Sequence, residues 1–191
     1  MTILSEIISY NKNFVEEKQF EEYATTKFPD KRIVILTCMD TRLTELLPKA
    51  MNLRNGDAKI IKSAGAIVTH PFGGIMRSII IAVYELQADE VYIIGHHDCG
   101  MSSIDTDNII SHMVERGVDN SLFSTLKYSG IDMKDWLRGF SDVTQSVKSS
   151  VDQVRNHPLM DRSVPVHGLV AHPDTGALDI IIDGYERIDD K

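Results

Sequence analysis

The chain has few cysteines, no surplus of basic residues and no long apolar run, and each of these absences excludes a class of protein or of partner. Only two of its 191 residues are cysteines, Cys38 and Cys99. Two are too few for the disulfide framework of a small secreted scaffold. In a reducing compartment, lone cysteines are metal ligands, catalytic groups or buried fillers, and the choice depends on where the fold places them.

Charge and hydropathy exclude several classes of partner. Lysine and arginine together number 20 against 28 aspartates and glutamates, a net charge of -8. Because phosphate backbones and anionic lipids demand a basic surface, we expect no nucleic-acid partner and no membrane partner. No window approaches the roughly 18 apolar residues of a membrane span, and the N-terminus lacks the features of a signal peptide, so we expect a cytoplasmic protein. The glycine-rich nucleotide motifs Gly-x-x-x-x-Gly-Lys-Ser/Thr and Gly-x-Gly-x-x-Gly are also absent.

Length and periodicity predict one α/β domain over residues 1–191. A hydrophobic content of 42% is enough for a sizeable core. Short β-branched runs alternate with helical patterns, which predicts a mostly parallel central sheet flanked by helices. An N-terminal helical arm and a C-terminal antiparallel hairpin strand complete the expected fold. We expect strands over 33–37, 59–62, 91–94, 164–170 and 178–182, and helices over 4–18, 75–86, 107–116 and 143–154. The stretch 117–139 shows no regular pattern.

Both cysteines follow apolar, strand-like runs. Cys38 comes directly after one run, and His96 and Cys99 follow another. Parallel strands end at one edge of a sheet, where ligands bind, so we expect these three side chains to converge. Two thiolates and an imidazole suit Zn²⁺, whereas Mg²⁺ or Ca²⁺ takes oxygen ligands; residue type alone leaves iron open. Three protein ligands with a fourth position for water are typical of a catalytic zinc site.

The two motifs together carry a family resemblance. Cys38-Met-Asp40-Thr-Arg42, followed by His96-His-Asp-Cys99-Gly100, resembles the signature of the beta-class carbonic anhydrases, close to their compact prokaryotic branch. The resemblance implies a Zn²⁺ cofactor and reversible hydration of carbon dioxide to bicarbonate and a proton through a zinc-bound hydroxide. It also implies a homodimer or tetramer, with the active site at the interface and the N-terminal helix reaching over the partner.

Asp40 and Arg42 are the catalytic candidates beside the expected zinc. We expect Asp40 to accept a hydrogen bond from the zinc-bound water, and Arg42 to hold Asp40 ionised through a bidentate pair. In some family members the equivalent aspartate is a fourth zinc ligand in an inactive state; near neutral pH we expect the open state here. Gly65 is expected to bring its backbone close to the site, and Gly100 to offer its N–H to a substrate oxygen.

Other functions compete with this interpretation. The same scaffold hosts hydrolases of carbonyl sulfide or carbon disulfide. A non-catalytic zinc-binding protein is a second alternative, against which the Asp40/Arg42 pair argues. Metal-free thiol catalysis is a third, but Arg42 follows Cys38 too closely for a Cys-x₅-Arg phosphate loop. Where many family members read Arg-Asn-Ala-Gly-Asn, residues 62–66 read Lys-Ser-Ala-Gly-Ala, so we expect no second, inhibitory bicarbonate site.

Overall fold

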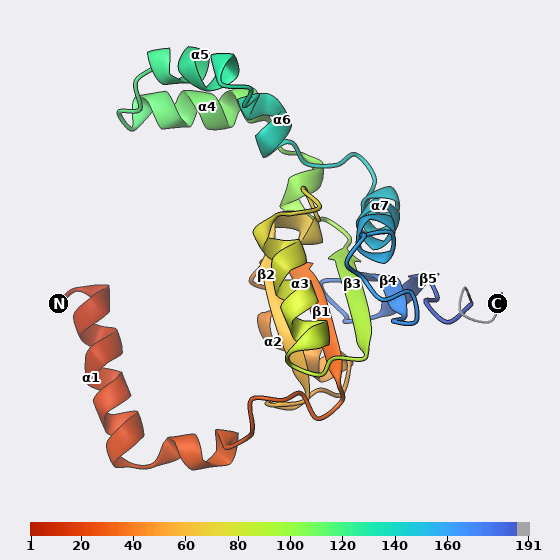
Figure 1. Cartoon of the computed structure of the whole chain (residues 1–191). Helices are drawn as coiled ribbons and strands as arrows, with labels where there is room; N and C mark the ends of the chain where they lie inside the picture. The colour runs from red at the N-terminus through yellow and green to blue at the C-terminus, as the bar shows by residue number, and fades with distance from the viewer. Residues whose placement is uncertain (187–191) are drawn as a thin grey trace.

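A five-stranded sheet forms the centre of the computed structural model, which describes residues 1–186 (Figure 1). The strands are β1 (Ile33–Cys38), β2 (Ala58–Ser63), β3 (Glu90–His96), β4 (Val166–Ala171) and β5 (Leu178–Ile182). Their order across the sheet is β2-β1-β3-β4-β5. The first four strands pair in parallel, and β5 pairs antiparallel with β4. The predicted fold, including the C-terminal hairpin, is confirmed.

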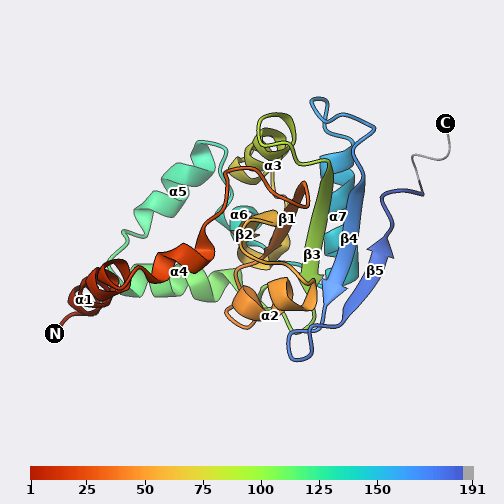
Figure 2. The same cartoon turned by 90° about the horizontal axis from the view of Figure 1, so that it is seen from below.

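Helices cover both faces of the sheet, which explains the uninterrupted apolar character of β1. Helices α3 (Gly74–Tyr84) and α7 (Val143–Arg155) lie on one face, and α2 (Leu43–Ala50) lies on the other (Figure 2). The first face packs Val34, Leu36, Val91 and Ile93 against Met76, Ile79, Val147 and Val151. The second packs Ile35, Ile94 and Leu169 against Leu43 and Leu47. All six residues of β1 are buried.

Some helices have no counterpart in the sequence pattern. Helix α2 contains Pro48, a residue that usually breaks a helix, and its eight residues are too few for a clear periodicity. The expected helix over 107–116 is α4 (Thr106–Glu115), and the patternless stretch after it contains α5 (Ser121–Tyr128) and α6 (Met133–Leu137). Within residues 1–186, none of the helices combines the length and apolar character that a membrane span requires.

The predicted N-terminal arm is helix α1 (Ile3–Glu16), followed by the short 3₁₀-helix η1 (Gln19–Tyr23). Thr2 caps α1 in a reciprocal pair with Ser5. No residue of α1 is buried, although Leu4, Ile7 and Ile8 form an apolar stripe. In Figure 1, α1 and the α4–α6 segment both project from the body on the side where β2 forms the sheet edge.

The α4–α6 segment leaves the body and returns to it at one point. It starts after the 3₁₀-helix η3 (Gly100–Ser102), and on its return Phe140 donates its backbone N–H to the carbonyl oxygen of Met101 at 3.2 Å. The preceding residue, Gly139, lies so close that a Cβ atom there would be 1.8 Å from the same oxygen. Glycine is therefore required at this crossing of two backbones.

Replacing Gly139 by alanine should destabilise the fold by about 3 kcal/mol, because the clashing atom is backbone and the loops have to separate. Urea unfolding measures this change. Gly74→Ala is the matched control, since a Cβ at Gly74 meets nothing within 4 Å and its helical position favours alanine. Equal stability of the two variants would contradict the packing described for Gly139.

Candidate metal centre

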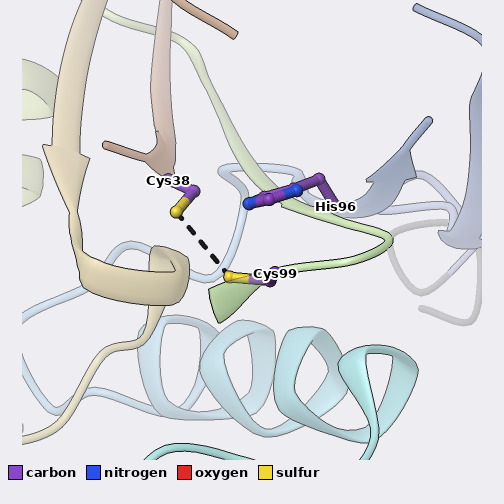
Figure 3. A group of neighbouring side chains, drawn as sticks. All are labelled: Cys38, His96 and Cys99. Atoms are coloured by element: carbon purple, nitrogen blue, oxygen red, sulfur yellow. Dashed lines mark hydrogen bonds between the residues drawn. The ribbon is translucent and has the colours of Figure 1, made fainter. Parts of the chain in front are cut away.

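Neighbouring parallel strands deliver the three candidate ligands to one edge of the sheet. Cys38 is the last residue of β1, and His96 is the last residue of β3. Three residues after His96, the chain turns and places Cys99 immediately before η3. The sulfur and ring-nitrogen ligand atoms of the three residues lie within 4.8 Å of one another (Figure 3). The convergence expected from the strand order is confirmed.

The spacing of the two sulfurs suits a tetrahedral ion. Cys38 Sγ and Cys99 Sγ are 3.8 Å apart. Two sulfurs bound at about 2.3 Å to a tetrahedral Zn²⁺ are about 3.8 Å apart as well. Both cysteines are buried, and both are free thiols. The pair therefore needs no rearrangement to accept such an ion.

The tautomer of His96 leaves a ligand atom free. His96 Nδ1 lies 2.8 Å from the carbonyl oxygen of His97, and because a carbonyl only accepts, Nδ1 carries the proton. The neutral ring then presents the lone pair of Nε2. That nitrogen is buried and finds no hydrogen-bond partner among residues 1–186. A buried acceptor without a partner is the state in which a metal-binding imidazole is held.

The surroundings shift the pKa values of the two thiols in opposite directions. Burial raises the pKa of Cys38, but His96, when its ring also carries a proton on Nε2, and the backbone N–H groups of Asp40 and Gly65 outweigh it and lower that pKa to about 7. Burial, with the charge of Cys38 adding to it, raises the pKa of Cys99 to about 11, against an opposing hydrogen bond from Met101 N–H. One sulfur is thus prepared as a thiolate, and the other ionises readily only beside a cation.

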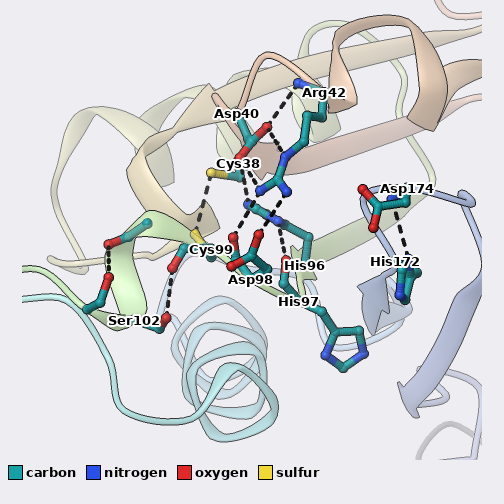
Figure 4. Close-up of polar contacts among 12 residues, drawn as sticks. Cys38, Asp40, Arg42, His96, His97, Asp98, Cys99, Ser102, His172 and Asp174 are labelled. Carbon is teal, nitrogen blue, oxygen red and sulfur yellow. Dashed lines mark hydrogen bonds and ion pairs between the residues drawn. The ribbon is translucent and has the colours of Figure 1, made fainter.

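Asp40 and Arg42 form the expected bidentate pair. Arg42 Nε donates to Asp40 Oδ1 at 3.0 Å, and Arg42 Nη2 donates to Asp40 Oδ2 at 2.9 Å. The side-chain hydrogen bonds from Arg42 lower the pKa of Asp40 to about 2. Asp40 Oδ2 also lies 3.8 Å from His96 Nε2. An ionised acceptor consequently stands at the rim of the Cys-His-Cys group (Figure 4).

The two glycines proposed as substrate contacts have different surroundings. Gly65, with φ +71°, directs its N–H to Cys38, and a Cβ there would lie 3.0 Å from Met101 Cγ and 3.1 Å from Phe140 Cε1. At Gly100 a Cβ would meet nothing within 4 Å. Gly65 therefore belongs to a packed wall, whereas Gly100 borders open space.

Three residues of this region carry no signal in the sequence pattern. Asp98 contacts Arg42, and Met101 and Phe140 pack against the cluster that contains both cysteines. Met101 and Phe140 are 39 positions apart in the chain, so only the return of the α4–α6 segment reveals their contact. His97, which follows a candidate ligand, faces Asp179 at 3.6 Å and points away from the sulfurs.

Comparison with known proteins agrees with this architecture. The family model described as carbonic anhydrase matches residues 33–178. A Bacillus subtilis (strain 168) protein named "Putative carbonic anhydrase YvdA" is 59% identical over 97% of this chain and 94% of its own length. A carbon disulfide hydrolase of Acidithiobacillus thiooxidans is 30% identical over 78% of this chain and 76% of its own.

A solved structure shows the same fold. The beta-carbonic anhydrase isoform I of Trichomonas vaginalis superposes with a TM-score of 0.88 at 36% identity, covering 97% of this chain and all of that one. The family match spans the four parallel strands, the Cys-His-Cys group and the Asp40–Arg42 pair. This chain belongs to the beta-carbonic anhydrase family.

Proposed function

We propose that this protein is a zinc-dependent carbonic anhydrase that interconverts carbon dioxide with bicarbonate and a proton. The observation that carries the proposal is an ionised carboxylate, Asp40, held by Arg42 at the rim of a buried Cys-His-Cys group. Two thiols and an imidazole with an unpaired nitrogen fit Zn²⁺, which Cys38, His96 and Cys99 would hold. When bound, the ion supplies a Lewis acid that lowers the pKa of water to about 7, so that hydroxide is available at neutral pH.

Asp40 would orient the reacting water. With its pKa lowered to about 2, the carboxylate accepts hydrogen bonds at neutral pH and does not donate them. A water that donates to Asp40 has its remaining lone pair directed away from the carboxylate, toward the carbon of an incoming carbon dioxide. Arg42 keeps the carboxylate in place through two parallel hydrogen bonds, a geometry that fixes orientation as well as charge.

We assign the active form to the arrangement in which Asp40 stays paired with Arg42. The bidentate pair supports this assignment, because a carboxylate that moved to the metal as a fourth ligand would lose those hydrogen bonds. Crystals of the zinc-loaded protein grown near neutral pH test it. An Asp40 oxygen within about 2.2 Å of the metal would contradict it.

Gly100 and Gly65 are assigned different parts in substrate binding. The open space beside Gly100 supports our proposal that its N–H meets a substrate oxygen. Gly65 lies in the wall formed by Met101 and Phe140, so we place its backbone behind the substrate. Because the Gly65 N–H already donates to the Cys38 sulfur, we propose that Gly65 acts more on the thiolate than on the substrate.

Carbon disulfide hydrolysis is the second candidate. The 30% identical Acidithiobacillus relative carries that name, so the scaffold of this family accommodates a second linear substrate. In this chain both reactions would use the Cys-His-Cys group, so access to the pocket would decide between them. Release of sulfide from carbon disulfide, assayed on the same zinc-loaded sample, separates the two.

We also propose that the protein works in the cytoplasm as a homodimer or a tetramer. The apolar stripe of α1 supports the assembly: Leu4 is 69% exposed and Ile7 is 57% exposed in the single chain. A stripe of this kind is stable when a second surface covers it. A fungal relative in the same fold class is described as tetrameric. The two free thiols suit a reducing compartment.

The first prediction concerns metal and turnover together. We expect about one zinc per chain by elemental analysis and rapid carbon dioxide hydration by stopped flow on the same sample. Zinc without hydration but with sulfide release from carbon disulfide would transfer the assignment to the second candidate. A chain that takes up no zinc would overturn the proposed function.

Two substitutions separate the metal ligand from the orienting carboxylate. Cys38→Ser should lose zinc, because a hydroxyl does not replace a thiolate at this site. Asp40→Ala should keep zinc and lose about 100-fold in turnover, the loss expected when a reacting group is no longer oriented. Asp174→Ala, which removes an exposed carboxylate from the turn between β4 and β5, is the control. Full activity of the Asp40 variant across the neutral range would refute this role.

The two thiols of the metal-free protein should ionise in separate steps. Thiolate absorbance in the ultraviolet, followed against pH, should rise near pH 7 for Cys38 and again near pH 11 for Cys99. Cys38→Ser should remove the first step and leave a late one. A single transition of both thiols at the ordinary thiol pKa would show that the hydrogen bonds to Cys38 are ineffective.

The assembly prediction concerns the apolar face of α1. Ile8→Glu places a charge within the stripe and should shift the molecule toward the single-chain mass in light scattering coupled to gel filtration. Asn13→Glu adds the same charge on the opposite side of the helix and should leave the mass unchanged. If the Ile8 variant retained the wild-type mass, α1 would not be an interface.

A further inference from the structure

Arg42 connects the two loops that carry the candidate metal ligands. Besides its two side-chain hydrogen bonds to Asp40, it donates from Nη1 to Asp98 Oδ2 at 2.9 Å and from Nη2 to the carbonyl oxygen of Asp98 at 2.9 Å. Asp40 belongs to the loop that directly follows Cys38, the last residue of β1. Asp98 belongs to the loop after β3, directly before Cys99. One guanidinium thus spans both loops.

The backbone of Asp98 is adapted to this contact. Its φ of +52° lies in the left-handed region, which residues other than glycine seldom occupy and which aspartate and asparagine tolerate best. In that conformation the carbonyl and the carboxylate of the same residue both face Arg42 (Figure 4). The left-handed residue also makes the turn that brings the chain from His96 back to Cys99.

An ordinary surface ion pair is the competing explanation. The side chain of Asp98 is 83% exposed, and isolated pairs at such exposure contribute little. Here, however, the pair is one part of a network: Arg42 makes four side-chain hydrogen bonds to two residues, and its other carboxylate partner, Asp40, is only 18% exposed. Networks with fixed, forked geometry are the case in which such contacts hold structure.

We propose that Asp98 is a positioning residue for the metal centre. Through Arg42 it fixes the Cys99 loop against the Cys38 loop, so that the two sulfurs keep the spacing a bound ion requires. The contact between Asp98 and Arg42 also holds the guanidinium in position to bind Asp40. The spacing of the two sulfurs and the orientation of the Asp40 carboxylate therefore depend on the same contact. The inference rests on the proposed function for its metal, but it concerns zinc affinity rather than turnover.

The test uses Asp98→Gly, which keeps the left-handed backbone and the carbonyl and removes the carboxylate. We expect zinc affinity, measured by competition with a chromophoric chelator, to fall about 10-fold, as for partners that orient a metal's ligands. The visible spectrum of the Co²⁺-loaded protein should change as well, because it reports ligand geometry. Asp98→Asn, which keeps an acceptor oxygen, should lie between wild type and glycine.

Two controls give the result its meaning. Asp135→Asn removes the carboxylate from a comparable exposed pair, Asp135 with Arg138 at 3.0 Å, outside the metal centre, and should leave zinc affinity unchanged. In an Arg42→Gln background, Asp98→Gly should have little further effect, since its action passes through Arg42. Equal losses in both backgrounds would overturn the proposal.

The outcomes for Asp98 and for the proposed function are distinguishable. A wild-type protein that binds zinc without hydrating carbon dioxide refutes the proposed activity, while the affinities of the Asp98 variants still decide the positioning role. Wild-type affinity and an unchanged cobalt spectrum in Asp98→Gly would overturn the positioning role and leave the activity intact. A chain that binds no zinc overturns both.

Discussion

Parallel pairing of β1 with its two neighbours is the constraint on which the rest of the site depends. In the register of the sheet, Thr37 stands opposite Ile94 on one side and Cys38 stands opposite Ser63 on the other. Three strands therefore end at nearly the same level. The chain after β2 supplies the N–H of Gly65, the end of β1 supplies Cys38, and the end of β3 supplies His96. The Cys38 thiol, the Gly65 N–H and the His96 ring meet because the hydrogen bonds between the parallel strands align the strand ends that carry them.

That alignment creates an electrostatic problem, which the surrounding groups solve in part. Two sulfurs 3.8 Å apart cannot both ionise easily in a buried site, and burial, with the charge of Cys38 adding to it, raises the pKa of Cys99. Backbone N–H groups and His96 favour the thiolate of Cys38 alone. A divalent cation between the sulfurs removes the remaining cost. When its ring is neutral, His96 leaves the buried Nε2 without a hydrogen-bond partner among residues 1–186, so the donor set and its electrostatics both indicate a metal.

The sequence made the strands and the candidate ligands predictable because their signals are local. A strand buried on both faces reads as a continuous apolar run, and residues at its carboxyl end are read directly from the chain. The role of Asp98 was not predictable from the sequence, because it depends on a left-handed backbone and on a guanidinium from another loop. Helix α2 was not predicted because it contains Pro48, which disfavours a helix; the packing of Leu43 and Leu47 in the core stabilises it. Met101 and Phe140 meet only through the return of a long segment, which no local pattern encodes.

The α4–α6 segment is connected to the metal centre at the point where it rejoins the body. Residues 103–138 leave and rejoin the body at Met101, where Gly139 allows two backbones to cross and Phe140 packs toward the cysteines. Met101 in turn donates its N–H to Cys99. Close-packed backbone therefore links the return of the α4–α6 segment to a candidate ligand. Helix α1, with its apolar stripe uncovered in the single chain and only 14 residues long, is too short to be stable without a packing surface. Both α1 and the α4–α6 segment project from the body on the side where β2 forms the sheet edge, and the homodimer or tetramer proposed above would give the apolar stripe of α1 a surface to pack against.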